Sequence, residues 1–311
     1  MQGADRLRSR PLTGPGSPTV LCGTDFSPLA ARAATVAGLM ARAGGGRLHL
    51  VHAVRAPAVG AATAPGHRTR LAEEAERLRP LGIQVTDDVL WGEPDEALVR
   101  EAARVEAGLI VLGAIGHRAM DRWLLGSCAE RTAREAPVPV LVVRDERPFE
   151  EWLVRGRPLR VLAGCEPGAS SDAAVAWAGS LAALGPLDLV VARLVVPGPE
   201  NRRAGESGPG MGLSLYPDTE AALVEELRAR TTKLLGGAPV RLQVSPAIGR
   251  LDQHLVSVAE DGAADLVVVG SHHREGFRRW WKGSVSSGVL HRAPMTVAVV
   301  PFLQVPTPHH P

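Results

Sequence analysis

The sequence predicts two α/β domains in tandem, each built from parallel βαβ units. The chain has 311 residues, enough for two domains of ordinary size that each bury a core. It also repeats itself, because the segment 20–41 has a counterpart at 161–182 and the segment 109–143 has one at 266–300. In both halves, short apolar runs alternate with segments of helical periodicity, a pattern typical of parallel βαβ units rather than of a β-sandwich.

The short apolar runs are the expected strands. In the first half they are 19–22, 48–54, 109–112 and 138–143, with a further strand near 83–89. The second half repeats the scheme with 161–163, 189–194, 266–269 and 296–300, and a further strand near 240–244.

Helices are expected between these strands. The repeated segment at 20–41 and 161–182 continues from a strand through a turn into an alanine-rich helix. Elsewhere apolar residues fall at i, i+4 and i+7, which gives a helix one apolar stripe to lay on a sheet. These stripes are Leu71, Ala75 and Leu78; Leu98, Ala102 and Val105; and Leu251, Leu255 and Val258.

Composition excludes several classes of protein. Hydrophobic residues make up 45% and charged residues 22% of the chain, the balance of a soluble globular protein. Lys and Arg total 35 against 33 Asp and Glu, so no strongly basic field points to a nucleic-acid partner. No segment approaches the roughly 18 uninterrupted apolar residues of a membrane span, and no apolar stretch follows the arginines at the start. We therefore expect a cytoplasmic protein without membrane contact.

Changes in composition suggest the domain boundaries. We expect domains at 18–144 and 159–301, disordered tails at 1–17 and 302–311, and a charged, proline-bounded linker at 145–158.

Two connecting segments carry further expectations. Phe149, Trp152 and Leu153 in the linker are expected to dock on one of the domains. The segment 197–212 is rich in glycine, proline and charge, which predicts a mobile loop.

The three cysteines are expected to be reduced thiols. Cys22, Cys128 and Cys165 are odd in number and widely spaced, without CxxC pairs or histidines at metal-ligand spacing. Cys128 falls at an expected helix N-terminus, where a thiolate is favoured. The alternative is that Cys128 is a small residue filling the core.

A glycine pattern after the strand at 109–112 is the motif that carries chemistry. Gly113 ends a buried strand, Gly116 follows after two intervening residues, and Gly126 and Ser127 follow after nine more, before a helix. Ligands bind at such strand ends in open α/β sheets, and the first amides of a helix favour anions. Together the residues predict a phosphate cradle. The alternatives are a turn or a tight helix–strand contact for any one glycine, and a helix N-cap for Ser127.

Taken together, these motifs resemble one family specifically. The glycine spacing, the TDFS turn at 24–27 and the ending APVPVLVV at 136–143 resemble the ATP-binding branch of the universal stress protein family. The resemblance covers nearly the whole chain, twice. It implies two doubly wound domains, each a five-stranded, mainly parallel sheet with helices on both faces, like the adenine nucleotide hydrolases. It also implies a nucleotide lying across the strand ends.

The resemblance assigns nucleotide contacts in the first half to matching positions only. It implies that Gly23, Thr24 and Asp25 lie beside the nucleoside and that Ala53 lines the adenine site. The residues implied around the ribose and phosphates, with the strand end that precedes them, are Leu112, Gly113, Gly116, Gly126, Ser127 and Cys128. The implied ligand is ATP, with Mg²⁺ bound through its phosphates, and the Ser127 hydroxyl donates to a phosphate or binds that Mg²⁺.

The second half departs from the motif. His273 stands where the second motif glycine is expected, and Glu166 replaces the aspartate after the first strand. The imidazole would obstruct close backbone approach and the longer carboxylate would intrude on the nucleoside pocket, although Gly270, Gly283 and Ser284 are retained. We expect a degenerate site here. His272 and His273 have no matched third ligand, so no metal site is expected.

The leading functional hypothesis is an ATP-responsive stress or signalling module whose nucleotide state alters its partners or its assembly. No catalytic residues are predicted, because the sequence has neither a Walker loop of the GxxxxGK[ST] type nor a nucleophile elbow. One alternative is a slow Mg²⁺-dependent ATPase. The other is a dimerisation scaffold in which both halves have lost their ligand.

The resemblance also implies how the halves associate. Family members pair through the edge strand that ends the fold, which here means the runs 138–143 and 296–300. We therefore expect an intramolecular pseudo-dimer, with a further homodimer possible.

Overall fold

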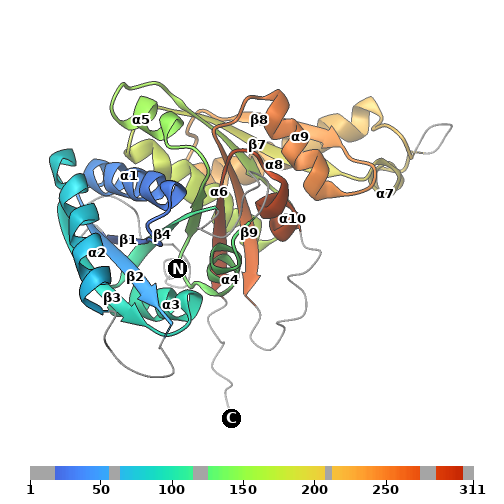
Figure 1. Ribbon diagram of the computed structural model, residues 1–311. Coiled ribbons are helices and arrows are strands. Elements are labelled where there is room, and N and C mark those ends of the chain that lie inside the picture. The colour runs from blue at the N-terminus through green and yellow to red at the C-terminus, as the bar shows by residue number, and fades with distance from the viewer. Residues whose placement is uncertain (1–17, 56–63, 115–124, 207–211, 274–284, 304–311) are drawn as a thin grey trace, which may run out of the picture.

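A computed structural model describes residues 18–55, 64–114, 125–206, 212–273 and 285–303 (Figure 1). Ten strands form one sheet in the order β3-β2-β1-β4-β5-β10-β9-β6-β7-β8. The first half contributes β1 (Thr19–Gly23), β2 (Arg47–Val54), β3 (Gln84–Trp91), β4 (Ala107–Gly113) and β5 (Val140–Val143). The second half contributes β6 (Leu159–Gly164), β7 (Leu187–Val195), β8 (Arg241–Pro246), β9 (Leu266–His273) and β10 (Thr296–Leu303).

Helices cover both faces of this sheet. One face carries α1 (Pro28–Ala43), α2 (Ala64–Leu78), α5 (Arg147–Leu153), α6 (Ala169–Ser180) and α8 (Pro217–Leu235), whose apolar residues join one buried cluster. The other face carries α3 (Pro94–Arg104), α4 (Ser127–Glu135), α9 (Leu251–Asp261) and α10 (Val285–Arg292), which join a second cluster. The short 3₁₀ turns Arg79–Leu81 and Leu181–Ala183 follow α2 and α6, and α7 (Pro197–Arg203) follows β7.

The fold class predicted from the sequence is confirmed. Every predicted apolar run lies in or overlaps a strand, and strand pairs within each half are parallel. Successive residues of β4 alternate between the two buried clusters, with Leu109 and Val111 on one face and Ile110 and Leu112 on the other. The runs are continuously apolar because both faces of a doubly wound sheet are covered. Within the described ranges, no helix combines the length and apolar character needed to cross a membrane.

The two halves meet edge to edge. β5 pairs with β10 in antiparallel register, with Val142 opposite Val297 and Val140 opposite Val299. Just after β5, the Arg144 backbone N–H donates to Thr296 Oγ1 at 3.3 Å, and its guanidinium donates to the Leu290 carbonyl at 3.0 Å. The sheet therefore continues through the junction, along the two edge strands that the family resemblance had indicated.

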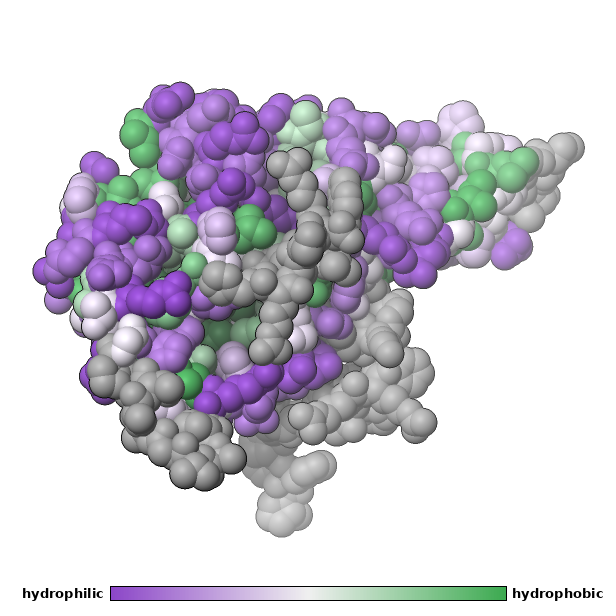
Figure 2. All heavy atoms as spheres, in the orientation of Figure 1, coloured by the Kyte–Doolittle hydropathy of each residue, from purple (hydrophilic) through white to green (hydrophobic). Residues whose placement is uncertain are grey.

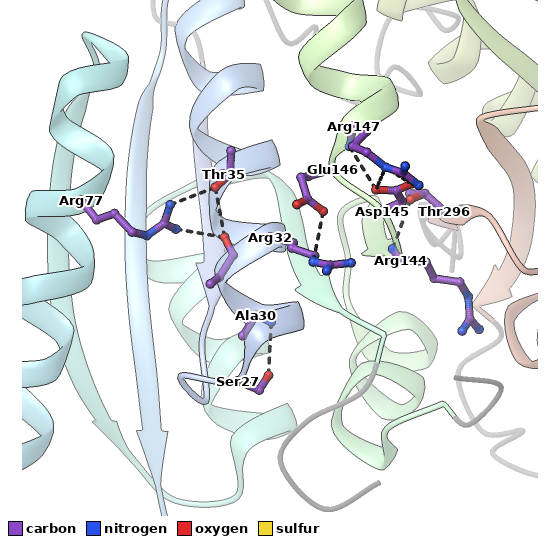
Figure 3. Close-up of polar contacts among 11 residues, drawn as sticks. Ser27, Ala30, Arg32, Thr35, Arg77, Arg144, Asp145, Glu146, Arg147 and Thr296 are labelled. Carbon is purple, nitrogen blue, oxygen red and sulfur yellow. Dashed lines mark hydrogen bonds and ion pairs between the residues drawn. The ribbon is translucent and has the colours of Figure 1, made fainter. Parts of the chain in front are cut away.

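The expected linker is partly helical and contacts both halves, which corrects the expectation that it docks on one. Phe149 and Trp152 of α5 are fully buried in the same cluster as α1 and β6. Glu146 pairs with Arg32 of α1 at 3.3 Å, as Figure 3 shows. On the other side, an added Cβ at Gly185 would lie 2.6 Å from Trp152 Nε1, so the indole packs directly against the second half. The short α5 therefore ties the halves together.

The segment 197–212 was expected to be a mobile loop, and for its first part this is wrong. Residues Pro197–Arg203 form α7, while 207–211 lie outside the described residues. Asn201 is fully buried, donates to the Ser214 carbonyl and accepts from the Tyr216 N–H. These tertiary bonds hold α7 against residues 214–216, and Figure 2 shows a small group of apolar residues on the side of the molecule where α7 lies.

Candidate nucleotide site

The turn between β1 and α1 is held by its own polar side chains. The Thr24 Oγ1 accepts from the Phe26 N–H at 3.0 Å, and Asp25 Oδ1 accepts from the Ser27 N–H at 3.0 Å. Ser27 then caps α1, because its Oγ accepts from the Ala30 N–H at 3.2 Å (Figure 3). Phe26 has a left-handed φ of 62°, which this network sustains. The TDFS sequence thus encodes a defined strand-to-helix turn.

His52 fastens this turn to β2. Its Nδ1 donates to the Thr24 carbonyl at 2.7 Å, while the Thr24 N–H donates to the Val51 carbonyl at 2.8 Å. The ring also contacts Phe26 and stacks on His67 of α2, with centroids 4.4 and 4.8 Å away. Burial holds the pKa of His52 below its usual value, so the imidazole is neutral at physiological pH. The turn is therefore anchored without an added charge.

A cavity of about 160 Å³ opens at the carboxyl ends of β1, β2 and β4. Seven residues implied by the family resemblance line it together: Gly23, Thr24, Asp25, Ala53, Leu112, Gly113 and Cys128. Sequence reasoning missed the remaining lining residues, which are Ala30, Val51, His52, Pro94, Leu98 and Ala129. Pro94 and Leu98 belong to α3, and the apolar stripe of that helix was the available signal for Leu98. The volume of this cavity is smaller than the roughly 300–1,000 Å³ of most ligand pockets, so the cavity has room for one part of a larger ligand.

The two strand-end glycines permit close packing around this cavity. An added Cβ at Gly23 would lie 2.7 Å from Leu112 Cδ2 and 3.0 Å from Leu98 Cδ2. One at Gly113 would lie 3.0 Å from the backbone carbonyl oxygen of Leu29, in the first turn of α1. Gly113 thus makes a tight helix–strand contact, as its alternative interpretation proposed. It also lines the cavity.

The glycine loop closes on itself beside the cavity. The Gly126 N–H donates to the Ala114 carbonyl at 2.8 Å, which brings the residues before and after the segment 115–124 together. α4 begins here, with Gly126 as its N-cap residue and Ser127 as its first helical residue. Ser127 is therefore not the N-cap residue, which was the alternative interpretation of this position, and its side chain is exposed at the start of the helix. Gly116 lies outside the described residues.

Cys128 is not a reactive thiolate. Burial raises the pKa of its thiol to about 11, and its Sγ lies 4.0 Å from Thr132 Oγ1. Desolvation outweighs any stabilisation that the helix N-terminus gives to the charged form. The structure favours the alternative, in which Cys128 is a small neutral residue lining the cavity.

Comparison with known proteins settles the family. A model described as the universal stress protein family matches residues 17–144 and, a second time, residues 159–301. The chain belongs to the universal stress protein family.

Two of its relatives illustrate a match to one half and a match to most of the chain. A universal stress protein of Thermus aquaticus is 37% identical over 134 residues, covering 40% of this chain and 98% of that protein. One of Mycobacterium tuberculosis is 28% identical over 218 residues, covering 70% of this chain and 69% of that protein. The crystal structure of a universal stress protein from Archaeoglobus fulgidus superposes with a TM-score of 0.67 at 17% identity, covering 91% of this chain and 98% of that one. This last likeness shows a shared fold.

The second universal stress protein repeat keeps the backbone of the site. The Cys165 N–H donates to the Ala192 carbonyl at 2.8 Å, as Thr24 does to Val51. Gly270 packs even more closely than Gly113, because an added Cβ would lie 2.2 Å from the Ser170 carbonyl oxygen. The strand-end glycine is thus retained where the fold itself requires it.

The side chains of the second repeat differ in ways that the sequence pattern did not reveal. Ser286 occupies the position of Ala129, and its hydroxyl donates to the Gly270 carbonyl, across the place where the first repeat has its cavity. Leu194 stands at the position of Ala53 in the matching strand register. Glu166 was expected to intrude on this pocket, but it is exposed. The side chain of His273, with Gly283 and Ser284, lies outside the described residues.

Proposed function

We propose that the first repeat binds ATP, with the base in the cavity at the ends of β1, β2 and β4 and the phosphates beside α4. The observation that carries this proposal is the closure of the glycine loop by the Gly126–Ala114 hydrogen bond at the N-terminus of α4. Backbone N–H groups in the first turn of a helix lack intrahelical partners and favour anions. An apolar cavity next to such amides suits a nucleotide, which has an apolar base and anionic phosphates.

The lining residues fit the parts of that ligand. Val51, Ala53, Leu98 and Leu112 offer apolar surface to the base, and the small side chain at position 53 leaves room for it. Thr24 and Asp25 supply polar atoms at the same mouth for the ribose. We assign Gly113, Gly116, Gly126, Ser127 and Cys128 to the phosphates, with Mg²⁺ bound through the phosphates and the exposed Ser127 hydroxyl beside it.

We further propose that the second repeat does not bind ATP tightly, and that the nucleotide state of the first alters partners or assembly. Ser286 and Leu194 reduce the space at the corresponding position, and His273 interrupts the glycine spacing. The β5–β10 pairing supports an intramolecular pseudo-dimer of the two repeats, bounded at 18–144 and 159–301, which also leaves a homodimer of whole chains as a possible assembly.

Titration calorimetry with ATP and Mg²⁺ tests the assignment. One site per chain is expected, and Ala53→Leu, which copies the residue of the second repeat, should remove most of the binding. The matched control is Leu194→Ala, which should leave the first site unchanged. Gly116→Val should weaken binding by about tenfold or more, or ~1.4 kcal/mol, because a branched side chain opposes close approach of the backbone. Two equal sites, or full binding in Ala53→Leu, would contradict the proposal, and phosphate release in the same samples detects slow hydrolysis.

A further inference from the structure

A second polar constellation lies in the first repeat, away from the nucleotide cavity. His49 of β2 and Glu101 of α3 are both buried, each with 6% of its surface exposed. His49 Nε2 lies 2.7 Å from Glu101 Oε1, and His49 Nδ1 lies 2.8 Å from Oγ1 of Thr86, the residue directly opposite it on β3. Thr86 itself is exposed on the edge strand of the sheet. The hydroxyl of an exposed residue is therefore hydrogen-bonded to a buried histidine, which a carboxylate contacts on its other nitrogen.

The hydrogen bonds indicate the tautomer that a neutral His49 adopts. Arg104 Nε donates to Glu101 Oε2 at 2.8 Å, and this contact with that of His49 keeps the pKa of Glu101 below its usual value. The carboxylate can only accept, so Nε2 of a neutral His49 carries the proton and donates to it. In this tautomer Nδ1 has the lone pair and accepts from the Thr86 hydroxyl at 2.8 Å, while the other acceptor near that hydroxyl, the Leu48 carbonyl, lies farther away at 3.5 Å. The direction of these hydrogen bonds, from Thr86 to His49 to Glu101, is the one found between a nucleophile, a general base and an orienting carboxylate.

The fold does not need this network, because the second repeat lacks it. In the matching strand register and helix position, His49 corresponds to Val190 and Glu101 to Val258, while Arg241 is opposite Val190. Both valines pack against the apolar cluster on that face. A buried polar network that a homologous repeat replaces with aliphatic side chains is not explained by packing alone.

We propose that Thr86 is an activated hydroxyl that accepts an acyl group from activated acyl donors such as aryl esters, with His49 as its general base. The Thr86 oxygen attacks the carbonyl carbon while its proton passes to His49 Nδ1. The bond from that carbon to the leaving oxygen breaks, the leaving group takes the proton from His49, and an ester of Thr86 remains. Glu101 is a positioning residue that holds the imidazole in the required tautomer.

Acetylation by p-nitrophenyl acetate, followed by peptide mapping, tests this assignment. The background is low, since the sequence has only two lysines, Lys233 and Lys282. Thr232, exposed on α8, serves as an internal reference hydroxyl. A positioned general base typically accelerates such a step about 10²–10⁴-fold, so Thr86 should be acetylated at least about tenfold faster than Thr232.

Variants separate an activated hydroxyl from a merely exposed one. Thr86→Ser should retain the acetylation and Thr86→Val, of the same shape, should lose it. His49→Gln and Glu101→Gln should each lower the rate at Thr86 toward that of Thr232, and circular dichroism establishes which of them fold. Equal rates at Thr86 and Thr232 in the natural sequence, or an undiminished rate in a folded His49→Gln or Glu101→Gln protein, would overturn the proposal. The ATP titration is independent of this outcome.

Discussion

Replacing the strand-end glycines by alanine should separate folding from nucleotide binding. At Gly270 the added Cβ would lie 2.2 Å from the Ser170 carbonyl oxygen, so the first turn of α6 must move away from β9. At Gly113 the nearest backbone atoms of α1 would lie at 3.0 Å, which a shift of a few tenths of an ångström relieves. Overpacking of this kind costs about 1–3 kcal/mol, and we expect Gly270→Ala near the upper end and Gly113→Ala near the lower.

The effect on ATP affinity should be larger for Gly113→Ala than for Gly270→Ala, the opposite of the order expected for stability. The first turn of α1 continues directly from the Thr24–Ser27 turn, so moving it to accommodate the methyl group of Gly113→Ala displaces residues at the mouth of the cavity. If about 1 kcal/mol of strain is relieved in this way, ATP affinity falls about fivefold. Gly270→Ala should leave ATP affinity unchanged, because the proposed site lies in the first repeat.

Urea unfolding and titration calorimetry measure the two quantities on the same proteins. Gly66→Ala is the matched control, because no atom lies within 4 Å of its added Cβ and it is within α2, where alanine is favoured over glycine. Unchanged stability of Gly270→Ala relative to Gly66→Ala would refute the packing argument. An equal loss of ATP affinity in Gly270→Ala and Gly113→Ala would refute the assignment of the site to the first repeat.

Three further predictions concern the junction, the cavity thiol and the second repeat. Trp152→Ala should destabilise the protein by about 3–5 kcal/mol in urea unfolding, because the indole is buried against both repeats. Iodoacetamide should modify Cys128 slowly at pH 7 and faster as pH rises toward its pKa of about 11, and bound ATP should protect it. Because burial raises that pKa above the value of about 9 in the unfolded chain, only the unfolded thiol ionises between about pH 9 and pH 11, and folding stability measured by urea unfolding should fall over that range. Finally, calorimetry should show no second ATP site in His273→Gly with Glu166→Asp until Ser286→Ala and Leu194→Ala are both added, since Ser286 bonds to Gly270 and Leu194 fills the position of Ala53.

The parts of the fold that depend on residues close together in the chain could be predicted from the sequence. Continuous apolar runs such as 109–112 identified covered strands, and the internal repeat showed that one fold occurs twice. The TDFS turn was also readable, because Thr24, Asp25 and Ser27 bond to backbone groups two or three residues away. Such short-range bonds follow from residue type and spacing.

Features that depend on contacts between residues far apart in the chain could not be predicted from the sequence. α7 forms in a segment rich in glycine and proline because the buried Asn201 bonds to residues more than ten positions away. α5 contacts both repeats because Trp152 fits against Gly185, a pairing that no periodicity indicates. In the site, sequence reasoning did not single out Ser286, whose bond to the Gly270 carbonyl is a difference that only the folded structure shows.

The antiparallel pairing of β5 with β10 has a consequence for regulation. Because both strands belong to one chain, their association does not depend on protein concentration, and dilution cannot separate the repeats as it would two subunits. α5 adds a buried contact to each side of the junction. Separation of these repeats would therefore be an intramolecular opening of the sheet between β5 and β10, with the same equilibrium at every protein concentration.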